Sequence, residues 1–112
     1  MRAIKIDPVN RTIEEIDLAV DPNRSLGELR SIIGTICLQL IPLDTGICLL
    51  AAAVNEQDAG FGFVGGDLLV RGTAVVLGGR WKRLRALDEG LRSFELAVDW
   101  RNEQNGAQNA ET

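Results

Sequence analysis

The sequence contains no histidine and no tyrosine among its 112 residues, and its only aromatic side chains are three Phe and two Trp. Without histidine, the chain has no Ser-His or Cys-His catalysis, no imidazole ligand for zinc or haem, and no imidazole charge switch near neutral pH. No other motif dictates a reaction. We therefore expect a protein that is not an enzyme, binds no metal and carries no cofactor.

Cysteine is scarce, because Cys37 and Cys48 are too few for a disulfide framework. They flank a predicted turn at residues 42–46. We consider two registers, with Cys48 opposite Leu40 or opposite Ile41, and neither brings the two sulfurs face to face. The sequence therefore predicts two buried free thiols in a reducing cytoplasm.

Long hydrophobic runs without a charge or a turn signal are also missing. Residues 35–54 have Asp44 as their single charge, with Pro42 and Gly46 beside it, which indicates two strands and a turn rather than a membrane span. Residues 1–11 carry charges throughout and have no apolar stretch, so we expect no signal peptide. These features predict a cytoplasmic protein without a membrane partner.

The formal net charge of −4 is unevenly distributed along the chain. Residues 31–70 contain four acidic and no basic side chains, whereas residues 71–92 contain six basic and two acidic ones. A net acidic protein is repelled by polyphosphate at long range, which disfavours general nucleic-acid binding. A local basic patch remains compatible with this charge.

The apolar fraction of 46% suits one domain of ordinary size. We predict a single globular domain over residues 1–101 and a flexible polar tail over residues 102–112, because the tail has no apolar anchor.

The hydrophobic pattern predicts an α+β fold, a mostly antiparallel β-sheet with both helices on one side. Expected strands occupy residues 3–7, 11–18, 36–41, 47–54, 61–64, 68–77 and 81–85, with a hairpin turn at Gly78–Gly79. The nearly continuous hydrophobicity of the hairpin around residues 42–46 indicates strands covered on both faces or a tightly packed centre.

Two helices are predicted. A short helix near residues 26–33 would begin with a capping box formed by Ser25 and Glu28 and end at Gly34. A C-terminal helix near residues 87–100 follows from one apolar stripe, made of Leu87, Leu91, Phe94 and Val98.

A glycine-rich run over residues 60–65 matches G-x-G-x-x-G by its letters. The dinucleotide-binding version of that motif follows a strand and opens a helix. Here a polar loop precedes the run and a β-rich stretch follows it, so we interpret the glycines as structural.

One basic segment is the candidate binding site, and its residues are Arg80, Trp81, Lys82, Arg83 and Arg85. In a strand, Trp81, Arg83 and Arg85 share a face, which suits stacking on a base and pairing with its phosphate. The same cations also suit an acidic protein surface. A third interpretation is a solvated edge strand whose charges are balanced by four acids, Asp67, Asp88, Glu89 and Glu95.

Several segments together carry a family resemblance, namely residues 1–8, 13–16, 33–34, 40–43 and 69–76. In their order and character they resemble a small family found on phages and plasmids, the domain of unknown function 3846. The resemblance covers residues 1–91, although residues 51–58 depart from the acidic turn usual in that family.

That resemblance implies an accessory protein of a phage or other mobile element, in the cytoplasm of its bacterial host. By analogy alone, small acidic proteins in this setting often inhibit host defences. We therefore expect a non-enzymatic protein that binds a host or viral macromolecule, with a protein partner favoured over nucleic acid. The alternative is a nucleic-acid or nucleotide-binding protein that uses residues 80–85, and a homodimer is left open.

Overall fold

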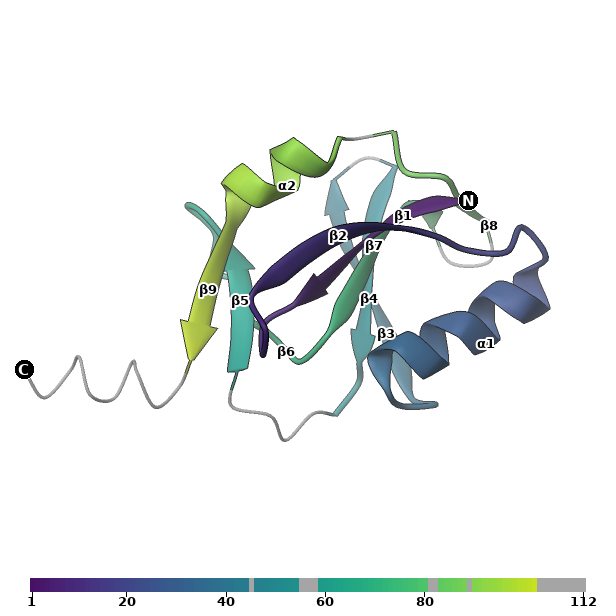
Figure 1. Ribbon diagram of the computed structural model, residues 1–112, viewed down its shortest axis with the longest axis horizontal. Coiled ribbons are helices and arrows are strands. Elements are labelled where there is room, and N and C mark those ends of the chain that lie inside the picture. The colour runs from purple at the N-terminus through teal and green to yellow at the C-terminus, as the bar shows by residue number, and fades with distance from the viewer. Residues whose placement is uncertain (45, 55–58, 81–82, 89, 103–112) are drawn as a thin grey trace, which may run out of the picture.

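Two antiparallel sheets and two helices make up the part of the chain that its computed structural model describes (Figure 1). The structure describes residues 1–44, 46–54, 59–80, 83–88 and 90–102. The predicted α+β class, with a mostly antiparallel sheet, is confirmed.

The large sheet places a late strand between two early hairpins. Its order is β2-β1-β7-β4-β3. Strand β8 pairs with the C-terminal half of β7, on the same side of β7 as β1, which pairs with the N-terminal half. The strand bounds are β1 Arg2–Asp7, β2 Thr12–Asp17, β3 Leu38–Asp44, β4 Ile47–Ala52, β7 Ala74–Arg80 and β8 Arg83–Arg85.

The small sheet has the order β6-β5-β9. Its strands are β5 Ala59–Phe63, β6 Val70–Arg71 and β9 Val98–Asn102. The strand predicted over residues 68–77 is thus two strands in two sheets. The chain leaves β6 at Gly72, whose φ of 79° is in the left-handed region that favours glycine.

Both faces of the large sheet are covered, each by its own hydrophobic core. On one face, Leu29 of helix α1 (Pro22–Ile33) packs with Leu50 and Val75. On the other face, Phe61 of the small sheet and Phe94 of helix α2 (Leu91–Ala97) belong to a second core. This double cover explains the continuous hydrophobicity of β4, in agreement with the first of the two interpretations of that pattern.

The two helices therefore lie on opposite faces of the large sheet, and their predicted placement on one side is wrong (Figure 1). A sheet that is apolar on both faces must bury both of them, and one short helix covers only one.

Helix α1 begins four residues before the predicted start. Asp21 is its N-cap, with an extended backbone and a side chain that accepts a hydrogen bond from the backbone N–H of Asn23 at 3.4 Å. Pro22 occupies the first helical position, where its fixed φ suits the helix and its missing N–H is not needed. The predicted end is confirmed, because Gly34 has a φ of 91° and donates to Arg30 O at 2.8 Å.

The predicted capping box does not form, because its two residues lie inside the helix. The Ser25 hydroxyl is buried and donates to Pro22 O at 3.1 Å. The Glu28 carboxylate reaches out of the helix and accepts from the backbone N–H of Ala19 at 3.2 Å. Both side chains are thus engaged, but with the chain around the helix start.

The predicted C-terminal helix is shorter, because α2 ends at Ala97 and the chain continues as β9. There Val98 pairs with Phe63 and Trp100 pairs with Phe61. Asn102 is the last residue of this strand. The rest of the predicted tail, residues 103–112, lies outside the described part of the chain.

The two cysteines differ in environment. In the observed register Cys48 pairs with Pro42, so both predicted registers are wrong. The reason is a register shift between Pro42 and Asp44, which pairs with Ile47 at the β3–β4 turn. Both thiols are free, as expected. Cys48 is buried, and its burial raises the pKa of the thiol, whereas Cys37 is exposed, so the predicted burial of Cys37 is wrong.

Candidate partner-binding surface

The basic segment belongs to a tight hairpin between β7 and β8. Arg80 pairs with Arg83, Gly79 with Leu84 and Gly78 with Arg85. Trp81 and Lys82, two of the five predicted site residues, lie outside the described residues. Because the chain reverses after Arg80, the turn predicted at Gly78–Gly79 is wrong.

The two glycines lie inside β7, where they let the strands approach closely. A Cβ atom at Gly79 would be 2.1 Å from Arg83 O, and one at Gly78 would be 2.5 Å from Ala86 O. No side chain fits at such distances without a shift of the backbone. Close contact with β8, and not a turn, therefore explains the two glycines.

The hairpin gathers three arginines on one face of the sheet. Directly opposite residues of an antiparallel pair lie on the same face, and alternate residues of a strand share one. Arg80, Arg83 and Arg85 therefore point to the same side, and we call these three residues the basic hairpin surface. Leu84 points to the other side and packs against the core that contains Leu29.

Arg85 is held by its surroundings. Its Nη1 lies 3.2 Å from Asp88 Oδ2, and both side chains are largely exposed. Its Nη2 lies over the β3–β4 turn, where a Cβ atom at Gly46 would be only 2.8 Å away. An exposed ion pair contributes little to stability, so this contact positions Arg85 without removing it from solvent.

Arg80 and Arg83 are different, because no ion pair joins either of them to an acid among the residues that the structure describes. Both are exposed and directly opposite each other. Like charges at such positions, with Cβ atoms about 4.5–5.5 Å apart, destabilise a sheet. Four acids were predicted to balance this segment. Asp88 pairs with Arg85, and Glu89 lies outside the described residues. No ion pair joins the other two, Asp67 and Glu95, to a described arginine of the segment.

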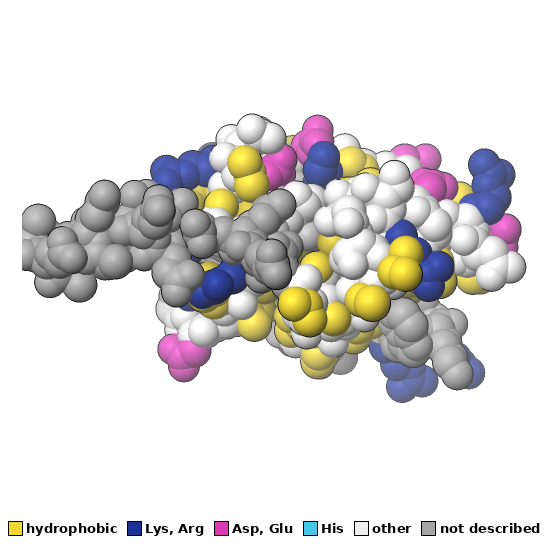
Figure 2. Space-filling view, turned by 90° about the horizontal axis from the view of Figure 1, so that it is seen from below, with side chains coloured by type: hydrophobic (Ala, Val, Ile, Leu, Met, Phe, Trp, Pro, Cys, Tyr) yellow, Lys and Arg dark blue, Asp and Glu magenta, His cyan; other side chains and the backbone are white. Residues whose placement is uncertain are grey.

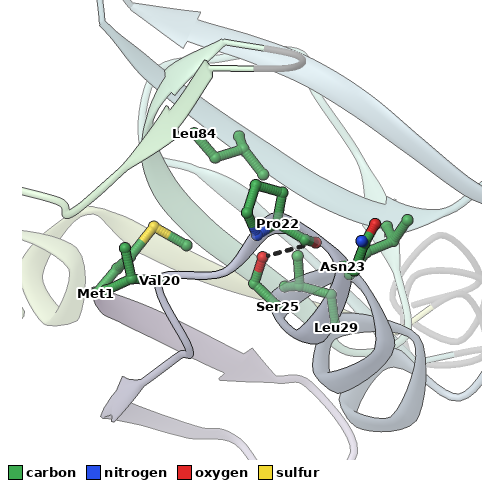
Figure 3. Close-up of a pocket in the computed structure, with 8 residues that line it drawn as sticks. Met1, Val20, Pro22, Asn23, Ser25, Leu29 and Leu84 are labelled. Atoms are coloured by element: carbon green, nitrogen blue, oxygen red, sulfur yellow. Dashed lines mark hydrogen bonds between the residues drawn. The ribbon is translucent and has the colours of Figure 1, made fainter.

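On the opposite side of β8, an apolar pocket of about 290 Å³ lies between the hairpin and the start of α1 (Figure 3). The labelled side chains of Leu84 and Pro22 face each other across it, with Met1 and Val20 at one end. The hydroxyl of Ser25 is already hydrogen-bonded to Pro22 O. The sequence does not reveal this pocket, because its lining comes from three segments that only the fold brings together.

The glycine-rich run forms β5 and the turn that follows it. Gly62 leaves room for Arg101, whose guanidinium donates to Leu68 O at 3.0 Å and to Gly66 O at 3.3 Å. A Cβ at Gly62 would lie 2.5 Å from Arg101 Cζ. A side chain of the protein therefore fills the space beside these glycines, which supports the structural interpretation over phosphate binding.

The described residues include no group of three His, Cys, Asp or Glu side chains placed to hold a metal ion. None of the helices that the structure describes is long and apolar enough to cross a membrane. A comparison of the chain with protein-family models, curated proteins and solved structures finds no match.

Proposed function

We propose that this chain is a non-enzymatic binding protein that docks its basic hairpin surface on an acidic patch of another protein. The observation that carries the proposal is the pair Arg80 and Arg83, two exposed cations directly opposite each other without an acidic partner among the described residues. Carboxylates of a partner would relieve their repulsion and accept charge-assisted hydrogen bonds from both guanidinium groups.

A protein partner is favoured over nucleic acid for two reasons. The net charge of −4 repels a polyphosphate before contact, whereas a protein can present a local acidic patch within a mixed surface. Arg85 already pairs with Asp88, and a protein can present its carboxylates to Arg80 and Arg83 alone, whereas a continuous phosphate backbone carries negative charge along the whole surface, Asp88 included.

The biological setting of the proposal comes from the resemblance to phage and plasmid proteins. In that setting the chain would be an accessory protein in the cytoplasm of a bacterial host, and its partner a host or viral protein. We propose that the chain inhibits a host defence by occupying an acidic site of its partner, by analogy with other small proteins of mobile elements.

The test is a pull-down from bacterial lysate with the immobilised full chain, with and without nuclease. We expect the Arg80→Gln/Arg83→Gln variant to retain at most about one tenth of the partner that the wild type retains. This corresponds to a loss of about 1.4 kcal/mol in binding free energy. The matched control is Arg24→Gln/Arg92→Gln, which removes the same charge from two other exposed arginines. This control should retain the partner.

The outcomes separate the function classes. Equal loss in both double variants would show a general charge effect and contradict the assigned surface. Loss of the complex on nuclease treatment, together with a steep dependence on salt, would assign the surface to nucleic acid instead. Retention by both variants would contradict the proposal.

A further inference from the structure

The outer edge of β8 carries a backbone N–H and C=O that β7 does not use. Gly79 N donates to Gly46 O at 2.8 Å, so the N–H of Gly79 points toward the β4 side of the sheet and away from β8. Opposite residues of an antiparallel pair either exchange both backbone hydrogen bonds or exchange none, in alternation. Gly79 and Leu84 are opposite each other, so the N–H and C=O of Leu84 point away from β7. No other described strand pairs with β8 on that side.

The two faces of β8 differ in chemistry at this edge. Arg83 and Arg85 belong to the basic hairpin surface on one face, and Leu84 lines the apolar pocket on the other. Successive side chains of a strand point to opposite faces. A segment paired along the edge would therefore place the side chain opposite Leu84 at the pocket and its two neighbours beside the arginines.

The pocket is suited to an uncharged aliphatic side chain. Its volume is about 290 Å³, and its lining contains two polar side chains, Asn23 and Ser25, and none that is charged. The Ser25 hydroxyl gives its proton to Pro22 O, so this group has no donor left for a ligand. Val20, which is 79% exposed, lies beside Met1 at one end of the pocket in Figure 3. Because apolar cavities of about 150 Å³ take up benzene, a leucine side chain fits in this space.

We propose that the partner presents an extended acidic segment that adds to the outer edge of β8, with an aliphatic side chain in the apolar pocket and a carboxylate beside Arg83. The inference rests on the proposed function and specifies what the basic hairpin surface recognises. In strand addition of this kind, backbone hydrogen bonds supply affinity and alternating side chains supply specificity. The N–H and C=O of Leu84 provide the first, and Arg83 and the pocket provide the second.

The charges of β8 select this occupant. The strand is three residues long and has an arginine at each end, two features that protect an edge from unselected pairing. A second copy of β8 would place arginines against arginines, whereas an acidic segment gives Arg83 the carboxylate that no described residue provides. Basic side chains at the lower right of Figure 2, the end of the molecule at which β8 lies in Figure 1, have no acidic side chain visible beside them. The same arginines thus exclude a basic strand and admit an acidic one.

A short peptide tests the charge requirement. The probe is acetyl-Ser-Glu-Leu-Glu-Ser-amide, titrated into the full chain and followed through the backbone amide signals of the protein in NMR. We expect saturable shifts at Arg83 and Leu84. Replacing both glutamates of the peptide by glutamine, or Arg83→Gln in the chain, should weaken binding at least about tenfold, because charge-assisted hydrogen bonds are lost.

A variant of the chain tests the pocket. Val20→Trp adds a bulky ring at an exposed position beside the pocket, and should abolish peptide binding because the leucine can no longer enter. The matched control is Val64→Trp, the same change at a position directly after β5 that is 72% exposed. This control should bind the peptide like the wild type.

Methylation of the peptide backbone tests the strand addition itself. A methyl group on the leucine nitrogen removes the N–H that Leu84 O accepts, and should abolish binding. A methyl group on the nitrogen of the second glutamate changes a group that points away from β8, and should be tolerated. The two methylated peptides have the same mass and charge, so they differ only in which backbone donor is lost.

The outcomes separate this inference from the proposed function. Binding that depends on the glutamates and on Arg83, but is equal for the two methylated peptides or for Val20→Trp and Val64→Trp, would overturn strand addition and leave an acidic partner in place. The absence of saturable binding of the unmodified peptide at millimolar concentration would also overturn the inference. The proposed function is decided separately, by the pull-down with Arg80→Gln/Arg83→Gln.

Discussion

At the scale of single residues, the glycines of this chain separate into those that a side chain would disturb and those that it would not. Gly62→Ala would place a Cβ 2.5 Å from both Leu68 O and Arg101 Cζ, so the contact between β5, β9 and the segment before β6 must open. We expect a loss of about 1–3 kcal/mol in the free energy of unfolding, measured by denaturant titration.

The matched control is Gly27→Ala in the middle of α1, where a Cβ meets no atom within 4 Å. Alanine has the higher helix propensity, so this change should stabilise the protein by about 0.5–1 kcal/mol. If both changes shift the denaturation midpoint alike, the close packing around Gly62 is contradicted.

The two thiols give a second prediction at this scale. Exposed Cys37 should react with a thiol reagent in the folded protein, whereas Cys48 should react only after unfolding, because burial both shields the sulfur and raises the pKa of the thiol. The measurement is the number of thiols titrated with and without denaturant. In Cys37→Ser, a fast reaction of the folded protein would contradict the burial of Cys48.

At the scale of elements, the start of α1 depends on one side chain. Asp21→Ala removes the acceptor for a backbone N–H of the first turn and should reduce stability by about 0.5–2 kcal/mol in thermal or denaturant unfolding. Asp21→Asn keeps an oxygen at the same place and should remain close to wild type. An equal loss in both variants would show that charge, and not capping, matters at this position.

The elements that could be predicted are those whose signals are local. The apolar positions of α1 and its glycine end were visible in the sequence, as was the β3–β4 hairpin. The start of α1 was missed because two local signals compete there, and Asp21–Pro22 defines the observed start rather than Ser25 and Glu28. The helical spacing of Phe94 and Val98 was misleading, because Val98 pairs with Phe63, which is distant in the chain.

The candidate site, too, could be predicted from the sequence only where its signals are local. The basic segment is visible in the sequence, but a turn predicted at Gly78–Gly79 separates Arg80 from the face that Arg83 and Arg85 share. The position of the turn depends on how closely β8 approaches Gly78 and Gly79, which is a contact between strands. The apolar pocket depends on Met1, Leu84 and the start of α1 coming together, and no local pattern encodes that.

At the scale of the whole molecule, the large sheet separates two cores. Leu29 belongs to the core beneath α1, and Ile4 belongs to the core beneath the small sheet and α2. Leu29→Ala should cost about 2–5 kcal/mol and Ile4→Val about 0.5–1.5 kcal/mol, because each leaves a cavity in a fully buried position.

Because the two sites share no core, their effects should add to within about 0.3–0.5 kcal/mol in the double variant, measured by denaturant unfolding. The unfolding should remain a single transition, since both cores rest on the same strands of the sheet. A coupling energy well above that range would show that the sheet transmits packing changes from one face to the other.

The place of β7 between two hairpins also sets an order of assembly. The β1–β2 and β3–β4 hairpins are each made of neighbouring chain, but the strand that joins them spans residues 74–80. On the ribosome, which delivers the N-terminal residues first, both hairpins emerge before the strand that unites them. During that interval β1 and β4 each have a free edge that only β7 later occupies, and contacts so distant in sequence form slowly. Mispairing and capture by a chaperone would therefore be concentrated in the time before β7 is inserted.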